Sequence, residues 1–105
     1  MKSNIKNLVR HSEISEKAIE KYLVQSVEYI GGICLKFSSN ISTGYPDRLV
    51  MSWGGICKWV ELKSKGRKPT KLQQLRHEQL RELGFPVYVI DSKEAVDQLI
   101  TDLMI

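Results

Sequence analysis

Apolar side chains along the chain change their spacing several times, and each change predicts a different element of structure. In residues 15–30 they recur at the spacing of one helix face, which predicts an amphipathic helix. Ser15 supplies a capping side chain at its start, and a glycine pair follows its end. The positions that define this face are Ile19, Leu23, Val27 and Ile30.

Three short runs rich in β-branched and aromatic residues follow and predict three strands in succession. The first covers residues 33–37 and leads into the polar loop SSNISTGYP. The second opens at Asp47 and extends to about Met51, and the third covers residues 56–63. Because the turn sequence Ser52-Trp-Gly-Gly55 separates the last two, we expect them to form an antiparallel hairpin.

The second half of the chain returns to helical spacing, interrupted by one more strand. Thr70 can cap a helix that Gly84 closes, FPVYVID predicts a buried strand, and Ser92 can cap a last helix. The predicted order is αβββαβα, an α/β protein in which helices cover a small central sheet. The apolar positions of the two helices are Leu72, Leu75, Leu80, Leu83 and then Val96, Leu99, Ile100, Leu103.

The strand KWVELK carries two charges where a half-buried strand ordinarily carries apolar residues. Successive side chains point to opposite faces, so Val60 and Leu62 share one face while Glu61 and Lys63 share the other. One interpretation is a solvated face with a surface ion pair, which contributes less than about 1 kcal/mol. The other is a site that needs an acid beside a base.

The stretch TGYPDRL favours a site, because it delivers a second carboxylate, Asp47, to the end of the neighbouring strand. Two adjacent carboxylates repel each other, and a divalent cation between them relieves the repulsion. Oxygen ligands without His or Cys indicate Mg²⁺ or Mn²⁺. The first helix offers a third acid, Glu16 or Glu20, although a helical Glu is more often simply exposed to solvent.

Asp47, preceded by Gly44-x-Pro46, is separated by thirteen residues from Glu61-x-Lys63. This arrangement resembles the PD-(D/E)xK nuclease superfamily and, more closely, the VRR-NUC family. The resemblance extends over most of the chain, because IEKYL, GGICLKF, GYPDRLV, WVELKSKGRKP, LQQLRHEQLRELGF and VYVIDS occur in the order typical of that family. It implies a restriction-endonuclease-like αβββαβ core with a mixed sheet, followed by a C-terminal helix.

The resemblance also implies roles for individual residues. Asp47, Glu61 and Glu20, with the backbone carbonyl of Leu62, would hold Mg²⁺, for which Mn²⁺ would substitute. Lys63 would orient or activate water and stabilise developing charge on the phosphate. Gln73 matches a glutamine near the catalytic cluster of the family, but Thr70-x-x-Gln73 also has the pattern of a helix capping box. Glu16 remains the alternative to Glu20.

Basic residues gather directly after the proposed catalytic lysine. The chain has 105 residues and a formal net charge of +4, which favours a polyanionic partner. A cluster of charge is often only a solvated loop, but beside a metal site we expect it to contact the phosphate backbone of DNA. The expected DNA-binding residues are Lys65, Arg67, Lys68, Lys71 and Arg76.

The length and composition of the chain favour a single domain over residues 1–105. We expect it in the cytoplasm, with no membrane partner. The chain contains no long uncharged apolar run, and its N-terminus lacks the apolar centre of a signal peptide. Cys34 and Cys57 show no metal or redox spacing, so we expect buried free thiols. By analogy with the family, a stand-alone domain of this size suits a phage or prophage gene.

The residues and the resemblance together predict a magnesium-dependent DNA endonuclease, and the resemblance implies selectivity for branched DNA such as four-way (Holliday) junctions. Cutting two strands of a symmetric junction needs two active sites, so we expect a homodimer. The alternatives are a non-cleaving nucleic-acid-binding subunit of a larger assembly and a monomeric flap nuclease with the same site. A zinc-protease motif at His77-Glu78 is excluded, because Arg81 stands where the second ligand would be, and we expect His77 on the helix surface.

Overall fold

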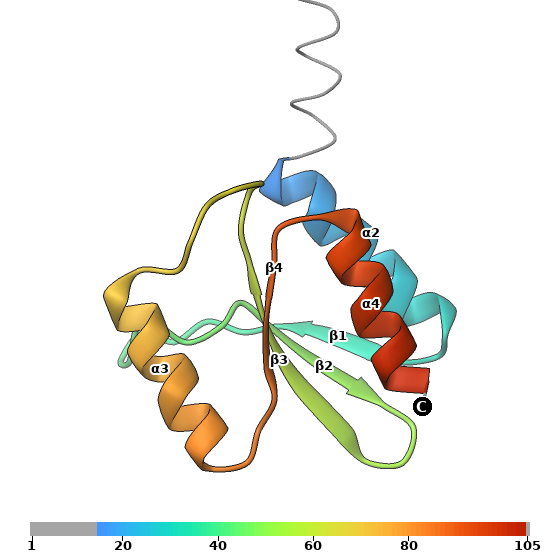
Figure 1. The fold of residues 1–105 in the computed structure, drawn as a ribbon. Coiled ribbons are helices and arrows are strands. Elements are labelled where there is room, and N and C mark those ends of the chain that lie inside the picture. The colour runs from blue at the N-terminus through green and yellow to red at the C-terminus, as the bar shows by residue number, and fades with distance from the viewer. Residues whose placement is uncertain (1–14, 105) are drawn as a thin grey trace, which may run out of the picture.

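The computed structural model of the protein describes residues 15–104 and shows the predicted α/β arrangement (Figure 1). The element order αβββαβα is confirmed, and most boundaries lie within one or two residues of those expected. Residues 1–14, whose sequence lacks the apolar centre of a signal peptide, lie outside this range. The elements are α2 (Glu16–Tyr29), β1 (Ile33–Lys36), β2 (Arg48–Ser52), β3 (Ile56–Leu62), α3 (Lys71–Glu82), β4 (Val87–Ile90) and α4 (Lys93–Met104).

The four strands form one mixed sheet in the order β1-β2-β3-β4. β1, β2 and β3 are consecutive antiparallel strands, and the predicted hairpin pairs Ser52 with Ile56 and Arg48 with Val60. β4 pairs with β3 in parallel, so the chain must cross over between them. α3 makes that crossover and lies on the opposite side of the sheet from α2 and α4 (Figure 1).

Side chains cap the helices where the sequence indicates. The Ser15 hydroxyl accepts a hydrogen bond from the Ala18 amide at 3.1 Å. At the start of α3, Thr70 and Gln73 form a reciprocal capping box, in which each side chain accepts a hydrogen bond from the backbone amide of the other residue. These caps satisfy amides that helix geometry leaves without partners, and they define where α2 and α3 begin.

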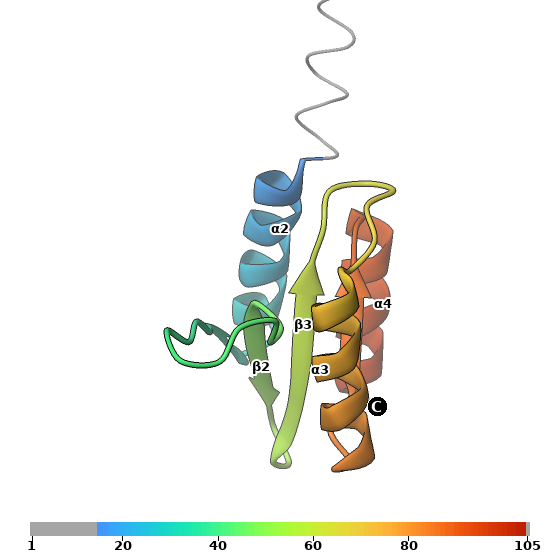
Figure 2. The same ribbon diagram turned by 90° about the vertical axis from the view of Figure 1, so that its left-hand side faces the viewer.

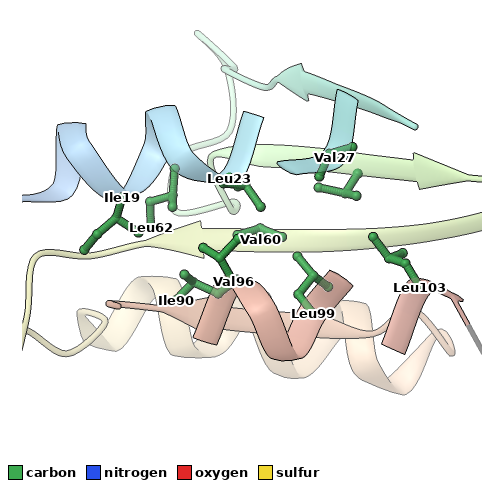
Figure 3. Packing of buried hydrophobic residues seen from close by; sticks show 10 residues of the cluster. Ile19, Leu23, Val27, Val60, Leu62, Ile90, Val96, Leu99 and Leu103 are labelled. Carbon is green, nitrogen blue, oxygen red and sulfur yellow. The ribbon is translucent and has the colours of Figure 1, made fainter. Parts of the chain in front are cut away.

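The hydrophobic core lies between one face of the sheet and the pair α2 and α4 (Figures 2 and 3). Val60 and Leu62 point into it from β3, as their alternation with Glu61 predicts. The buried residues of this core are Ile19, Leu23, Val27, Val50, Val60, Leu62, Ile90, Val96, Leu99 and Leu103.

The other face of the sheet is covered differently, and here two expectations are wrong. Of the four leucines predicted to line α3, only Leu80 is buried, and the rest are 41–74% exposed. The strand FPVYVID is not fully buried either, because Val89 is 38% exposed and lines a cavity of about 340 Å³ on the α3 side. α3 therefore adds little apolar surface to the core.

The cysteines are free, as expected, but both are half-buried. Within residues 15–104, no helix is long and apolar enough to cross a membrane.

Candidate active site

Glu61 is a buried carboxylate on the α3 side of β3. Its side chain is only 1% exposed, and its Oε2 lies 3.9 Å from the Nζ of Lys63, which is 16% exposed. The interpretation of these two residues as a solvated surface pair is therefore wrong. A carboxylate at this depth is costly unless partners compensate it, so its surroundings define its role.

Asp47 lies directly beside Glu61, as the sequence predicts. Its strand begins at Arg48, whose partner across the hairpin is Val60, so Asp47 continues the register opposite Glu61. The Asp47 Oδ2 accepts a hydrogen bond from the Leu62 amide at 2.8 Å, while its backbone carbonyl accepts one from Phe37. These two bonds fix the Asp47 carboxylate next to the Glu61–Leu62 backbone.

The two carboxyl groups affect each other strongly. Burial is the main cause that raises the pKa of Glu61 to about 8, and its hydrogen bond with Asp47 and the charge of Asp47 raise it further. The Lys63 ammonium acts in the opposite direction, but it does not cancel these effects. A second positive charge at this pair would favour the ionised form of Glu61.

α3 contributes two side chains that contact the two oxygens of Glu61. The Gln73 Nε2 lies 3.4 Å from Oε2, and the His77 Nε2 lies 3.3 Å from Oε1. His77 is only 2% exposed, so the expectation that it lies on the helix surface is wrong. Gln73 forms the predicted cap through its Oε1, and its Nε2 reaches Glu61.

Beyond the incomplete protease motif, the sequence contains a signal for the placement of His77. Gln73 and His77 are four residues apart, and residues at this spacing share one face of a helix. Burial lowers the pKa of His77, and the positive charges of Arg81 and Lys63 lower it further. The charge of Asp47 acts in the opposite direction.

The two candidate acids of α2 are placed differently. Glu20 forms an ion pair with Arg48, Oε2 to Nη2, at 3.0 Å. Glu16, in the first turn of α2, is exposed, and its charge is one of those that raise the pKa of Glu61. Electrostatically, Glu16 thus acts on the Asp47–Glu61 pair, whereas Glu20 is engaged with Arg48.

The donor set suits a hard divalent cation in its chemistry. Asp47 and Glu61 provide carboxylate oxygens, the Leu62 backbone adjoins them, and the raised pKa of Glu61 marks a place where positive charge is favourable. Within residues 15–104, no three or more His, Cys, Asp or Glu side chains are gathered closely enough to hold a metal by themselves. A bound ion would therefore take its remaining ligands from backbone, water or substrate, as Mg²⁺ commonly does.

The predicted DNA-binding residues fall into two groups. Lys65, Arg67 and Lys68, in the loop between β3 and α3, are exposed, as is Lys71 at the start of α3. Arg76 is half-buried. Its Nε donates to the Thr43 carbonyl at 2.9 Å, and its guanidinium lies 4.9 Å from the centre of the Tyr45 ring. Arg76 therefore ties α3 to the loop that carries Asp47.

Comparisons with known proteins bear on the family and the fold of the chain. No protein-family model matches the chain. It is 47% identical over 81 residues to "Putative nuclease p44" of Acyrthosiphon pisum secondary endosymbiont phage 1, with 77% of this chain and 87% of the relative covered. A solved VRR_NUC domain superposes with a TM-score of 0.77 at 36% identity, covering 82% of this chain and 94% of that domain. The chain therefore belongs to the VRR-NUC family of nucleases.

Proposed function

We propose that the protein is a Mg²⁺-dependent DNA endonuclease that hydrolyses phosphodiester bonds, with Mn²⁺ able to substitute. The observation that carries the proposal is the pair of adjacent carboxyl groups of Asp47 and Glu61, with the Lys63 ammonium 3.9 Å from Glu61. Family membership supports it, because the phage relative carries the name "Putative nuclease p44". The proposed site lies at the end of β3, where that strand leaves the sheet beside β4.

We assign each residue the role that its surroundings support. Asp47, Glu61 and the Leu62 carbonyl would hold the ion, and an acid of α2, Glu20 or Glu16, would complete its surroundings. When bound, the ion neutralises phosphate charge and lowers the pKa of bound water. Lys63 adds a positive charge at the same place, where it can orient water or stabilise the charge that develops on the phosphate.

The basic loop supports a DNA substrate. Lys65, Arg67, Lys68 and Lys71 are exposed and follow Lys63 along the chain, so they can contact phosphates on either side of the bond to be cut. Contacts of this kind position a duplex without reading its sequence. They are consistent with selection of DNA by shape, and we propose branched DNA such as a four-way junction, cut by a homodimer.

Cleavage of labelled linear duplex, flap, fork and four-way-junction DNA tests the proposal, with Mg²⁺, Mn²⁺ or a chelator present. The variants are Asp47→Asn and Lys63→Ala, with Glu82→Gln on the exposed end of α3 as the control. We expect the wild type and the control to cut branched DNA only with metal, and both site variants to lose at least about 100-fold in rate.

Three results would contradict the proposal or a part of it. Binding without cutting under any metal would overturn the nuclease function and favour a non-cleaving subunit. Cutting by Asp47→Asn at the wild-type rate would overturn the assigned site. Light scattering that finds a monomer both with and without junction DNA would overturn the homodimer and favour a flap nuclease.

A further inference from the structure

Two side chains of α3 enclose the carboxylate of Glu61. Gln73 approaches Oε2 at 3.4 Å, and His77 approaches Oε1 at 3.3 Å. Because they lie one helical turn apart, α3 presents both nitrogens to one carboxylate from a single rigid element. Each oxygen of Glu61 therefore has its own partner on the helix.

We propose that His77 is a positioning residue for the metal ligand Glu61, whose orientation it fixes by donating a hydrogen bond from Nε2 to Oε1. The proposal rests on the proposed function, because it takes Glu61 as a ligand of the divalent ion. His77 would act beside Gln73, which contacts the other oxygen of Glu61. This role also accounts for the one histidine that is buried among the described residues.

The burial of His77 is the second observation behind the proposal. The ring is 2% exposed and Glu61 is 1% exposed, so neither group can exchange its partner for bulk water. A buried imidazole costs free energy unless it is hydrogen-bonded, whereas an apolar residue at position 77 would pack without that cost. The residue type at this position is therefore explained by the hydrogen bond to Glu61 and not by packing.

The direction of the hydrogen bond follows from the chemistry of the ligand. A carboxylate that binds a cation is ionised and can only accept hydrogen bonds, so the imidazole must carry its proton on Nε2. Outer groups that hold a metal ligand in this way commonly change metal affinity by about 10–100-fold when they are removed. Loss of the donor at position 77 removes the hydrogen bond that holds Oε1 to α3.

Calorimetric titration of Mn²⁺ into the full-length chain without DNA tests this directly. The variants are His77→Leu, which removes the donor, and His77→Gln, which replaces it with an amide that can also donate. Glu61→Gln serves as the site control, and Glu78→Gln, at the exposed neighbouring position, serves as the matched surface control. Circular dichroism and thermal unfolding establish that each variant is folded.

We expect the dissociation constant of Mn²⁺ to rise about 10–100-fold in His77→Leu, to return most of the way to the wild-type value in His77→Gln, and to be unchanged in Glu78→Gln. The metal concentration for half-maximal cleavage should shift in parallel. Wild-type affinity in folded His77→Leu, while Glu61→Gln has lost binding, would overturn the positioning role. Wild-type affinity in Glu61→Gln would instead overturn the metal site of the proposed function.

A measurement on the wild type keeps the proposal testable if His77→Leu does not fold. Long-range proton–nitrogen NMR spectra of the Mg²⁺-loaded protein report which ring nitrogen of His77 carries the proton. The proposal requires protonated Nε2. A ring protonated only on Nδ1 cannot donate to Glu61 and would overturn it.

Discussion

The two faces of β3 have opposite chemistry, and successive side chains of the strand point to them in turn. Val60 and Leu62 enter a core formed with α2 and α4, in which every buried side chain is aliphatic. Glu61, between them, points to α3, and its buried neighbour His77 is the only other polar or charged side chain counted as buried in residues 15–104. One face of the strand thus supplies stability, while the other carries the residues of the candidate site.

The helices differ in the same way. α2 and α4 each bury three aliphatic residues, whereas α3 buries only Leu80 and His77. Polar contacts hold α3 in place instead, from Gln73 and His77 to Glu61 and from Arg76 to the Thr43 carbonyl. α3 therefore acts mainly as a support for the site, and changes to it should affect activity more than folding.

Neighbouring substitutions on β3 give the largest expected contrast. Glu61→Gln removes the charge but keeps the shape, so we expect at least about a 100-fold loss of single-turnover cleavage without loss of stability. Val60→Ala, one residue earlier, leaves a cavity in the core and should lower the free energy of unfolding with little change in cleavage at a temperature where it stays folded. Equal effects of both changes on cleavage would contradict the division of roles between the two faces.

Leucines on the two sides of the sheet should differ by several kcal/mol. Leu23 of α2 is fully buried, so Leu23→Ala should lower the free energy of unfolding by about 2–5 kcal/mol. Leu72 of α3 is 41% exposed, and Leu72→Ala should cost less than about 1 kcal/mol. Urea denaturation measures both, and similar losses would show that α3 contributes more to the core than its exposure indicates.

The pH dependence of stability should originate on the α3 side. The pKa of Glu61 is about 8 in the folded chain and 4.5 in its ordinary state. Between these values the unfolded chain has lost a proton that the folded chain keeps, so stability falls as pH rises toward 8. His77, whose pKa is lowered from 6.5, has the opposite effect below pH 6.5, because there the unfolded chain gains a proton first.

The interval from pH 6.5 to 8 therefore isolates Glu61. With a chelator present, we expect the free energy of unfolding of the wild type to fall by about 1 kcal/mol or slightly more per pH unit across this interval, relative to that of Glu61→Gln. Denaturant titrations at several pH values measure the difference, and saturating Mg²⁺ should reduce it. Parallel pH profiles for the two proteins would contradict the raised pKa.

Two glycines with positive φ differ in what surrounds them. Gly44 has φ +87°, and a Cβ there would lie 2.7 Å from the Leu72 Cγ of α3. Gly54, in the hairpin turn, has φ +83° with no atom within 4 Å of such a Cβ. Both Ala substitutions incur a conformational cost of about 1–2 kcal/mol. Only Gly44→Ala should also lower cleavage, by displacing α3 from the Asp47 loop, and equal cleavage by both variants would contradict this.

The sequence was sufficient for the elements and for the central pair of the site. Because side chains of a strand alternate between its faces, Glu61 is predicted to point away from the face that carries Val60. The hairpin turn sets the register that brings Asp47 beside Glu61. These are local properties, because they depend on one strand and one short connection. Ser15 and Thr70 marked the starts of α2 and α3 for the same reason.

The positions that sequence reasoning missed depend on how elements pack. Leucine spacing on α3 indicated an apolar face, but only part of α3 meets the sheet, so His77 is buried while Leu72 and Leu75 are not. The ion pair between Glu20 and Arg48 likewise depends on packing and cannot be predicted from spacing along the sequence. Arg48 adjoins Asp47 in sequence yet points to the α2 side, because successive residues of a strand face opposite ways.

The hairpin turn between β2 and β3 has a practical consequence for experiments on this protein. β2 leads away from Asp47 and β3 returns to Glu61, so the turn lies at the far end of both strands (Figure 1). The paired residues Arg48 to Ser52 separate the turn from the site by roughly 17 Å, at about 3.4 Å per residue. Trp53 is 78% exposed there, and Gly54 and Gly55 have open space around them. The turn is therefore a natural attachment point for a fluorophore or a fused recognition module that must leave catalysis undisturbed.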